Sequence, residues 1–458
     1  MSTRAAVAHP PALRVPHSAP PRHDPAPGVA EFFVISQTAL PALLFLPGTQ
    51  PYRLPLRVAS FAISLALLAW WLTGSARAGR PHPARTWVLA MLVYVGGMVF
   101  HPFTSSALAG AAQLMLYLAV AAPLFWAPSV VRGPDHLARL MALLLVCNGV
   151  NASVGVLQVY DPERWMPMEF SRLVTESAFG LGAVTYMGPN GLIVRPPGLF
   201  DNPGAVAGPG MYAALLGLVF GVSAIASWKR LLALAASFAG VAAIYLSQVR
   251  VSLVIAVLML AAYAGILSVQ DRGGRAVRFG ATAGLLVATT FSFALVLGGE
   301  SIAERTLTLF ERNPISLYSA SRGGQLVYTF EELLESYPLG AGLGRWGMIA
   351  GYFGGPGNAH VPSLWAEIQV TGWAIDGGIP LLTLALGALA ITLLANARVA
   401  LRDPQPRVRA CAAVILAANL GTAALIFSFT PFVTQIGLQF WFLAGALHGV
   451  ASRARVPA

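Results

Sequence analysis

Three arginines lie beside proline- or glycine-rich turns, where their side chains could bind an anion. Arg195 opens the run Arg-Pro-Pro-Gly-Leu-Phe-Asp-Asn-Pro-Gly, Arg250 separates two apolar runs, and Arg322 lies in Ser-Arg-Gly-Gly-Gln. Guanidinium groups bind phosphate oxygens bidentately and stay charged in a low-dielectric site. Each arginine also has a plainer interpretation, a side chain that reaches from apolar surroundings to the membrane interface. The residue types therefore indicate an anion site or a set of interface anchors.

Two residues further along the chain could act as a general base. His360 follows a glycine-rich stretch, and Glu367 follows it in the same segment. Histidine titrates near neutral pH without help, and glutamate does so when it is desolvated. A lone histidine in a loop is more often structural than catalytic, so the sequence predicts one base without deciding between the two.

A glycine-rich loop separates the third arginine from these bases. It begins at Pro338 and continues through Gly340, Gly342 and Gly344. Proline and closely spaced glycines are poor helix formers and favour a tight backbone loop. The stretch before it, residues 326–337, has leucines and Phe330 at helical spacing and predicts a short amphipathic helix.

The composition places these residues in a membrane protein. The chain has 458 residues, of which 56% are hydrophobic and 10% charged, whereas soluble domains are roughly a quarter charged. The formal net charge of +11 must be interpreted by location, so it gives no reason to expect nucleic acid as a partner. The two cysteines, Cys147 and Cys411, fall in or beside apolar runs and predict neither a disulfide framework nor a metal cluster.

The apolar runs predict an all-α integral membrane protein with about 12 transmembrane helices, because a bilayer core needs about 20 apolar residues per helix. The runs begin at about 30, 54, 86, 106, 136, 204, 231, 251, 279, 377, 411 and 432. Counts of 11 or 13 remain open, since the third run is short and the tenth could start earlier.

Basic residues predict the orientation of these helices. With both termini in the cytoplasm, 19 of the 29 basic residues fall on the inner side, nearly all in short loops. The two long segments then face outward, into the periplasm of a bacterial inner membrane. Both contain apolar and aromatic residues, so we expect short amphipathic helices lying on the membrane.

This topology divides the chain into seven parts. They are a disordered cytoplasmic tail (1–28), N-terminal transmembrane helices (29–160), a periplasmic segment (161–203), central transmembrane helices (204–298), a large periplasmic loop (299–376), C-terminal transmembrane helices (377–450) and a cytoplasmic tail (451–458).

No metal ion or other cofactor is expected at the site. The outward segments lack an Asp-x-Asp pattern, and the nearest approach to one is Asp161-Pro-Glu163. A proline between two acids favours an exposed turn. Arginines could supply the neutralising charge that a metal would otherwise bring.

The chain resembles the O-antigen ligase/polymerase family, polytopic glycosyltransferases of bacterial surface polysaccharide. The resemblance covers roughly residues 190–450 and rests on "RPPGLFDNPGAVAG", "LSQVRVSLVIAVL" and "SRGGQLVYTFEELLESYPLGAGLGRW". It implies that Arg195, Arg250 and Arg322 bind the diphosphate of a polyprenyl-linked glycan. It also implies that the loop at Pro338, Gly340, Gly342 and Gly344 shapes the site as part of a lid, whereas Arg305, with no motif around it, should tolerate lysine.

The chain departs from the family at the expected base. The family has histidine followed by asparagine about a dozen residues before a glycine that opens a span. Here Val361 follows His360, and the matching glycine is Gly372. Starting from Glu367 instead reaches Gly378, where the long apolar run begins, so both registers stay open.

The expected function is transfer of a glycan from an undecaprenyl-type diphosphate donor, in O-antigen or exopolysaccharide assembly. The reaction is expected to be inverting and metal-independent. The acceptor would be another glycan, for a polymerase, or lipid A–core, for an O-antigen ligase; the uncertain histidine slightly favours a polymerase. The alternatives are a secondary transporter or flippase of envelope precursors, and an inactive scaffold that contacts other proteins of polysaccharide assembly.

Overall fold

The computed structural model describes most of the chain between the two tails. The described residues are 28–46, 48–74, 80–167, 170, 180–189, 191–223, 226–270, 273–311, 313, 316, 318–354 and 361–453. The tails expected at 1–28 and 451–458 lie almost wholly outside them, and so does His360.

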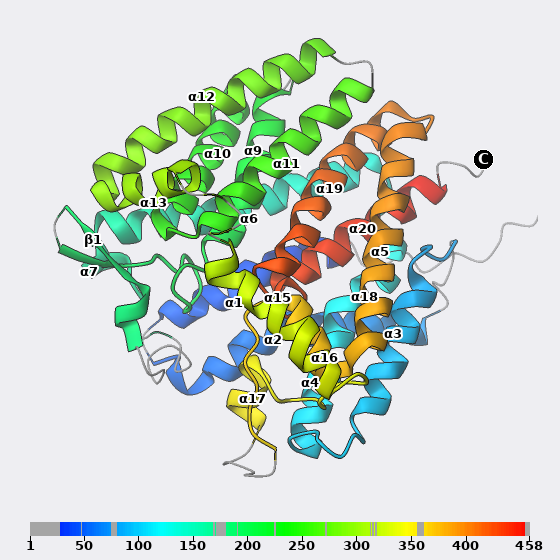
Figure 1. The fold of residues 1–458 in the computed structure, drawn as a ribbon. Coiled ribbons are helices and arrows are strands. Elements are labelled where there is room, and N and C mark those ends of the chain that lie inside the picture. The colour runs from blue at the N-terminus through cyan, green and yellow to red at the C-terminus, as the bar shows by residue number, and fades with distance from the viewer. Residues whose placement is uncertain are drawn as a thin grey trace, which may run out of the picture.

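The described chain is a bundle of long helices (Figure 1). Their bounds are α1 Val29–Ala42, α2 Arg53–Thr73, α3 Arg85–Met98, α4 Ala107–Ala121, α5 Pro123–Val130, α6 Pro134–Tyr160, α9 Ala207–Val222, α10 Ser227–Ser247, α11 Arg250–Val269, α12 Gly273–Gly298, α18 Gln369–Arg402, α19 Pro406–Ala424 and α20 Gln435–Arg453. With α5 taken as the continuation of α4, these helices fall on the apolar runs that the sequence predicts.

Eight helices of the described chain are long and apolar enough to cross a membrane, counting α4 with α5 and α19 with the turn after it. Three further apolar helices, α1, α3 and α9, are shorter. The last long helix, α20, is not among these eight. It is less apolar, because Gln435, Gln439 and His448 lie along its length. The expectation of an all-α protein with several membrane-spanning helices is thus confirmed, and the count of 12 stays a prediction.

Short elements fill the two segments expected outside. In the first are α7 Pro162–Trp165, the 3-10 turn η3 Gly180–Val184, and the strands β1 Thr185–Gly188 and β2 Gly191–Val194. In the second are α13 Glu300–Glu311, η4 Ser319–Gly323, α15 Gly324–Tyr328, η5 Thr329–Leu333, α16 Leu334–Ser336 and α17 Gly347–Phe353. Four 3-10 turns lie elsewhere: η1 Leu43–Phe45, η2 Gln50–Tyr52, η6 Leu425–Phe427 and η7 Pro431–Val433.

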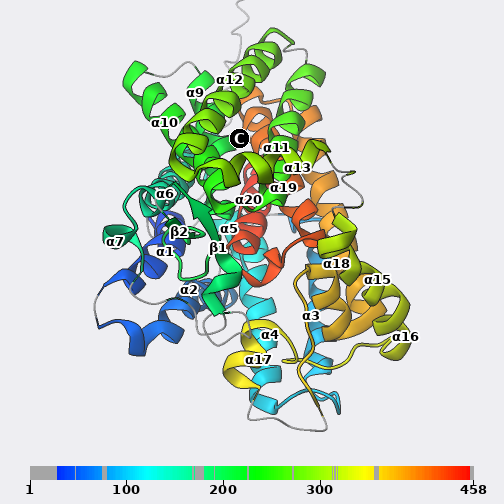
Figure 2. The ribbon, with the colours of Figure 1, turned by 60° about the vertical axis from the view of Figure 1, so that its left-hand side comes forward.

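The strands form an antiparallel hairpin that the sequence analysis did not predict. Thr185 pairs with Val194, and Gly188 pairs with Gly191 at the turn. Pro-Asn-Gly at 189–191 is a turn signal between two β-branched or aromatic stretches. The hairpin lies against α12 and α13 (Figure 2).

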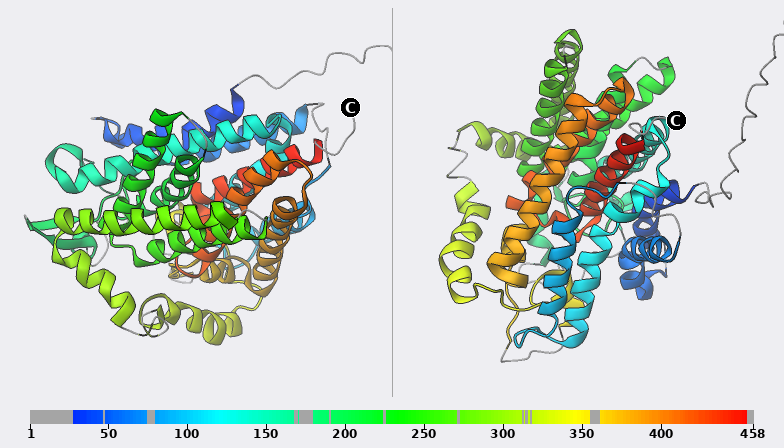
Figure 3. Two further views of the ribbon diagram at one scale, coloured as in Figure 1. Left: turned by 90° about the horizontal axis from the view of Figure 1, so that it is seen from above. Right: turned by 90° about the vertical axis from the view of Figure 1, so that its right-hand side faces the viewer.

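The amphipathic stretch expected at 326–337 is helical but not one regular helix. It forms α15, the π-helical turn η5 and α16, and another π-helical turn, η4, precedes it. Such wide turns are rare and frequently occur at functional sites. Seen from above, the segment from α13 to α16 runs along one side of the bundle and ends beside α18 (Figure 3).

Small residues bring α9 and α10 into close contact beneath the outer segments. A side chain at Gly210 would meet the carbonyl oxygen of Gly240 at 2.8 Å, and one at Gly217 would meet that of Ala233 at 2.5 Å. The hydroxyl of Ser237 donates to the carbonyl of Ala214 across the same interface, at 2.7 Å. Close backbone approach through small residues is the usual way in which helices associate in a membrane, and it fixes the end of α10, where the candidate site begins.

Candidate anion-binding site

Arg195 stands at the start of a loop that hydrogen bonds hold closed. Its backbone nitrogen donates to Val184 at 2.9 Å, and its carbonyl accepts from the backbone nitrogen of Gly204 at 3.2 Å. Gly198 and Gly204 have φ of 66° and 80°, a left-handed conformation that strains any residue with a side chain. The glycines of this motif therefore let the chain turn sharply between β2 and α9 and leave Arg195 at its entrance.

Two polar residues of α6 hold the middle of this loop. The side-chain amide of Gln158 accepts from the nitrogen of Gly198 and donates to its carbonyl, both at 2.8 Å. The side-chain oxygen of Asn151 accepts from the nitrogen of Leu199 at 3.0 Å. Buried amides that bond to backbone groups in this way fix a loop that has no regular structure. Arg195 consequently extends from a rigid support.

A buried ion-pair network fixes the end of the loop against α2. Asp201, only 4% exposed, accepts from Arg53 at 3.1 Å and from Arg57 at 2.5 Å. Arg57 also donates to the hydroxyl of Tyr352, at 3.1 Å. The sequence analysis did not single out Asp201 or its partners, because the partners lie more than a hundred residues away in the chain.

Arg250 is placed by a sharp turn between α10 and α11. Gln248 has φ of 54° and ends α10, and no other non-glycine residue in the described chain has a positive φ. The hydroxyl of Ser247 accepts from the nitrogen of Val249 at 3.3 Å and stabilises the turn. Arg250 is the first residue of α11 and lies half-buried, at a cavity lined also by Gln248 and Arg305.

Arg305 joins the three arginines that the motifs single out. It lies on α13, and its Nε donates to the carbonyl of Gln248 at 3.1 Å. Burial, followed by the positive charges of Arg195 and Arg250, lowers the pKa of Arg305 to about 10. The expectation that Arg305 tolerates lysine stays a prediction, and the position of Arg305 beside these arginines argues against it. The sequence carried no signal for that position, since α13 reaches the cluster only through the fold.

Arg322 completes a cluster of four guanidinium groups, which we call the arginine cluster: Arg195, Arg250, Arg305 and Arg322. Burial and then the charge of Arg195 lower the pKa of Arg322, while nearby Tyr318 acts in the opposite direction. Burial and then Arg250 lower the pKa of Arg195, opposed by Tyr186. Like charges this close repel one another, and a bound anion would relieve the repulsion.

Glu367 lies at the edge of the arginine cluster. Its carboxylate forms an ion pair with Arg322, and its backbone nitrogen donates to the side-chain oxygen of Gln325 at 2.9 Å. Both members of the pair are about one-third exposed, at 35% for Arg322 and 33% for Glu367. The structure thus brings one of the two candidate bases to the arginines, whereas His360 lies outside the described residues.

Most of the glycine-rich loop is buried, and its expected part in a lid stays a prediction. Residues 340–346 are all buried. Side chains at Gly340 and Gly342 would lie 2.5 Å from backbone atoms of Gly377 and Phe103, respectively, and both glycines have positive φ. Pro338 accepts from the nitrogen of Ile379 at 2.9 Å. The loop is therefore packed tightly between the α3–α4 connection and α18.

The loop affects the candidate base through Arg345, which sequence analysis also passed over. Arg345 is 3% exposed, and its guanidinium donates to the carbonyl of Ala341 at 2.9 Å and twice to that of Pro362, at 3.1 and 2.9 Å. Its own carbonyl accepts from the nitrogen of Leu364 at 2.6 Å. These bonds fix the segment that leads to Glu367. Gly344 has φ of 70°, and a side chain there would meet Ala109, so it shapes this loop directly.

A buried acid interrupts α18 where the loop crosses it. Asp376 is fully buried and accepts from Tyr117 at 2.6 Å, Gln113 at 3.2 Å and Trp346 at 3.0 Å. The next two residues, Gly377 and Gly378, depart from helical geometry. Three donors satisfy this carboxylate, so its place is structural: it joins α4, the loop and α18. A single acid within an apolar run is the signal that could have identified it.

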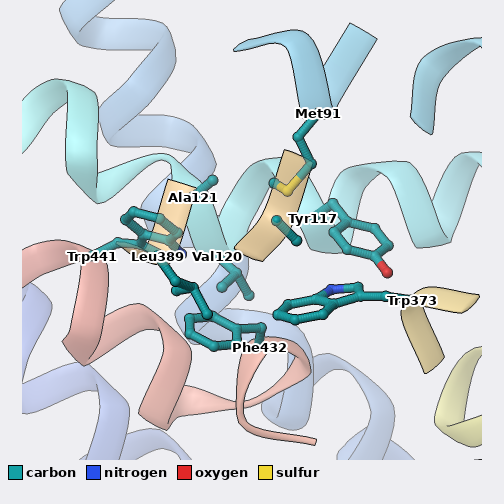
Figure 4. A pocket seen from close by; sticks show the side chains of 9 residues that line it. Met91, Tyr117, Val120, Ala121, Trp373, Leu389, Phe432 and Trp441 are labelled. Carbon is teal, nitrogen blue, oxygen red and sulfur yellow. The ribbon is translucent and has the colours of Figure 1, made fainter. Parts of the chain in front are cut away.

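An apolar cavity near Asp376 is a separate feature (Figure 4). Its lining residues are Met91, Tyr117, Val120, Ala121, Trp373, Ala385, Leu389, Phe432 and Trp441. The rings of Trp373 and Phe432 stack with centroids 5.7 Å apart. The cavity has room for about one water molecule, so it offers no binding site for a substrate.

Among the described residues, no group of three or more His, Cys, Asp or Glu side chains could hold a metal ion. Asp161 and Glu163 lie at the start of α7, where the carboxylate of Asp161 caps the helix by accepting from the nitrogen of Arg164 at 3.3 Å.

Comparison with known proteins assigns no family: no family model matches the chain, and no curated protein matches it.

Proposed function

We propose that this protein is a membrane glycosyltransferase whose donor is a glycan linked to a polyprenyl diphosphate. The observation that carries the proposal is the arginine cluster, in which Arg195, Arg305 and Arg322 each have a pKa lowered by burial and by a neighbouring arginine. Half-buried like charges are costly, and a diphosphate is an anion that matches several bidentate guanidinium groups. The active site would face the periplasm of a bacterial inner membrane, where the lipid-linked donor arrives already activated.

The proposed reaction needs charge stabilisation at the leaving group. The acceptor hydroxyl oxygen attacks the anomeric carbon from the face opposite the diphosphate, which inverts the configuration. The bond from that carbon to the diphosphate oxygen breaks, and its electron pair goes to the departing polyprenyl diphosphate. Guanidinium groups held in place before the reaction stabilise this growing negative charge without reorganising.

Glu367 is the residue that we favour as the general base. It would take the proton that the acceptor hydroxyl loses. The ion pair with Arg322 supports this choice because it holds the carboxylate beside the group that would bind the donor. A diphosphate that binds Arg322 would compete for the same guanidinium and so release Glu367 toward the acceptor.

The acceptor is either a further glycan unit, as in a polymerase, or lipid A–core, as in an O-antigen ligase. The resemblance covers both, and we retain the slight preference for a polymerase. Gel analysis of surface polysaccharide from a deletion strain separates them. Loss of the chain-length distribution with single units still attached indicates a polymerase. Loss of all attached polymer, with polyprenyl-linked chains accumulating, indicates a ligase.

A transporter or flippase is the competing function, and Asp376 is the feature that best fits it. An acid at a break in a membrane helix is a common ion site in transporters. However, Asp376 accepts from Tyr117, Gln113 and Trp346, so three protein donors already occupy it. This arrangement favours a structural acid, and the enzyme remains our proposal.

The direct test is glycan transfer by the purified protein in lipid vesicles, with a purified polyprenyl diphosphate-linked donor and candidate acceptors. We expect product with wild type and with Arg164→Lys, an exposed arginine on α7 that stacks over Trp165. Movement of the donor between leaflets without new product would instead establish the transporter.

The same assay after exhaustive chelation tests the expected independence from metal. Activity that is lost with the chelator and returns only with magnesium or manganese would refute that independence.

A further inference from the structure

Arg305 lies outside every motif in the sequence, yet the fold holds it in a defined place at the arginine cluster. It belongs to α13, which follows a turn at Gly299 with φ of 77°. Ile302, one helical turn before Arg305, is 1% exposed and packs in a cluster with Tyr245 and Leu246 of α10. Residues three apart lie on the same face of a helix, so the buried isoleucine directs Arg305 toward the end of α10.

Two hydrogen bonds fasten α13 to the turn that precedes Arg250. The side chain of Gln248 donates to the hydroxyl of Ser301 at 3.2 Å. The Nε of Arg305 donates to the carbonyl of Gln248 at 3.1 Å. Using Nε in this way orients the guanidinium plane and leaves its two terminal nitrogens as donors for a ligand.

Arg305 and Arg250 line one cavity. Its other lining residues are Ile244, Tyr245, Gln248, Val249, Leu253, Ile302 and Thr306. Its interior has room for only about one or two water molecules, so an anion would bind at its open mouth. Two arginines from different elements thus meet at one opening, and the apolar residues beside them would strengthen their attraction for an anion.

The number of guanidinium groups indicates the size of that anion. A terminal phosphate presents three strong acceptor oxygens, and two bidentate guanidinium groups are enough to occupy them. The arginine cluster contains four such groups, and Nε of Arg195 is buried with no hydrogen-bond partner among the described residues. A second phosphate would supply acceptors for the remaining donors.

We propose that Arg305 is a substrate-binding residue that contacts one of the two phosphates of the donor, across the cavity from Arg250, and so selects a diphosphate over a monophosphate. The inference rests on the proposed function, because it places the donor's diphosphate at the arginine cluster. It assigns recognition to a residue on an outer helix, which no sequence motif identifies.

The test measures binding of farnesyl diphosphate and farnesyl monophosphate to the purified protein in lipid nanodiscs. We expect wild type to bind the diphosphate about tenfold or more tightly than the monophosphate. A difference of that size is what the loss of one bidentate guanidinium–phosphate contact would cause. Arg305→Ala should lose about tenfold in affinity for the diphosphate and keep its affinity for the monophosphate. Arg305→Lys should fall between the two, because lysine keeps the charge but not the fork.

Ser301→Ala is the matched control, since it removes the other bond between α13 and the Gln248 turn and leaves the arginine in place. We expect it to bind both probes as wild type does. Equal affinities of wild type and Arg305→Ala for the diphosphate would overturn the inference, as would a loss in Ser301→Ala as large as that in Arg305→Ala. Each variant's thermal unfolding midpoint shows whether it is folded.

The inference and the proposed function can fail separately. If the purified protein makes no glycan product but Arg305→Ala loses the preference for diphosphate, the anion site stands and the transferase does not. If glycan is transferred but Arg305→Ala keeps both its rate and its diphosphate preference, the enzyme stands and this role of Arg305 does not.

Discussion

Two regions of the molecule hold half-buried or buried arginines in opposite ways. At the glycine-rich loop, Arg345 is 3% exposed and donates three hydrogen bonds to backbone carbonyls. In the arginine cluster, burial and then a neighbouring arginine lower the pKa of Arg195, Arg305 and Arg322, and the carboxylate that the structure describes beside them is Glu367. Arg345 is satisfied by the protein itself, whereas in the cluster Nε of Arg195 is buried without a hydrogen-bond partner among the described residues.

The difference separates a structural arginine from a ligand-binding one. A buried charge with a full set of acceptors holds backbone segments together, and removing it leaves those acceptors unpaired. A group of like charges costs folding free energy, and selection retains it where a ligand gains from it. The comparison therefore predicts that substitutions at the glycine-rich loop lower the stability of the fold, whereas substitutions in the arginine cluster lower activity.

The largest expected effect is on folding, at the glycines of the loop. In Gly342→Ala the new methyl group would lie 2.5 Å from backbone atoms of Phe103 at φ of 95°, so neither atom can yield cheaply. We expect a loss of about 3 kcal/mol or more in the free energy of unfolding, visible as little folded protein by size-exclusion fluorescence. Gly274→Ala, with no atom within 4 Å, is the control and should express as wild type does. Normal expression of Gly342→Ala would show that the loop is loosely packed.

A large effect on activity alone is expected in the arginine cluster. Arg250→Lys and Arg322→Lys keep the charge but lose the bidentate fork. Removing one preorganised donor from a developing anion costs about a hundredfold or more in rate. We expect that loss in the vesicle transfer assay, with protein levels unchanged and with Arg164→Lys fully active. Wild-type rates in both variants would return these arginines to the role of interface anchors.

A somewhat smaller effect separates the two candidate bases. We expect Glu367→Gln to lower the transfer rate by about a hundredfold, in the range of a lost general base, and His360→Ala to be mild. The measurement is single-turnover transfer with saturating donor, so that weaker binding does not mask the chemical step. If His360→Ala is the severe variant, the histidine register is correct; if both are mild, neither residue is the base.

The sequence predicted well whatever depends on local pattern. Apolar runs located the long helices, and glycine spacing located the turns at Gly198, Gly204 and Gly342. Proline and glycine constrain the backbone directly, so their positions are informative without any knowledge of the fold. The hairpin at 185–194 is an exception: Pro-Asn-Gly is a local turn signal, yet the hairpin was not among the predictions.

Features that depend on contacts between distant segments could not be predicted. Arg305 reaches the arginine cluster only because α13 packs on the end of α10, and Asp201 is paired by residues of α2. Nor does the pattern of the loop predict its packing, since glycine permits both exposed flexibility and close backbone approach. The close contacts of Gly340 and Gly342 come from segments far away in the chain.

The most direct test of the comparison measures both properties in one pair of variants, Arg195→Gln and Arg345→Gln. For each, the thermal unfolding midpoint in detergent and the transfer rate per folded protein in vesicles are determined from the same preparation. We expect Arg345→Gln to lose about 3 kcal/mol of stability, since buried carbonyls lose a charged donor, while its folded fraction still transfers glycan. Arg195→Gln should unfold at or above the wild-type midpoint, because it relieves repulsion, and should lose about a hundredfold in rate. If Arg195→Gln is instead destabilised as much as Arg345→Gln, or transfers glycan at the wild-type rate, the arginine cluster is not a site for the donor's diphosphate.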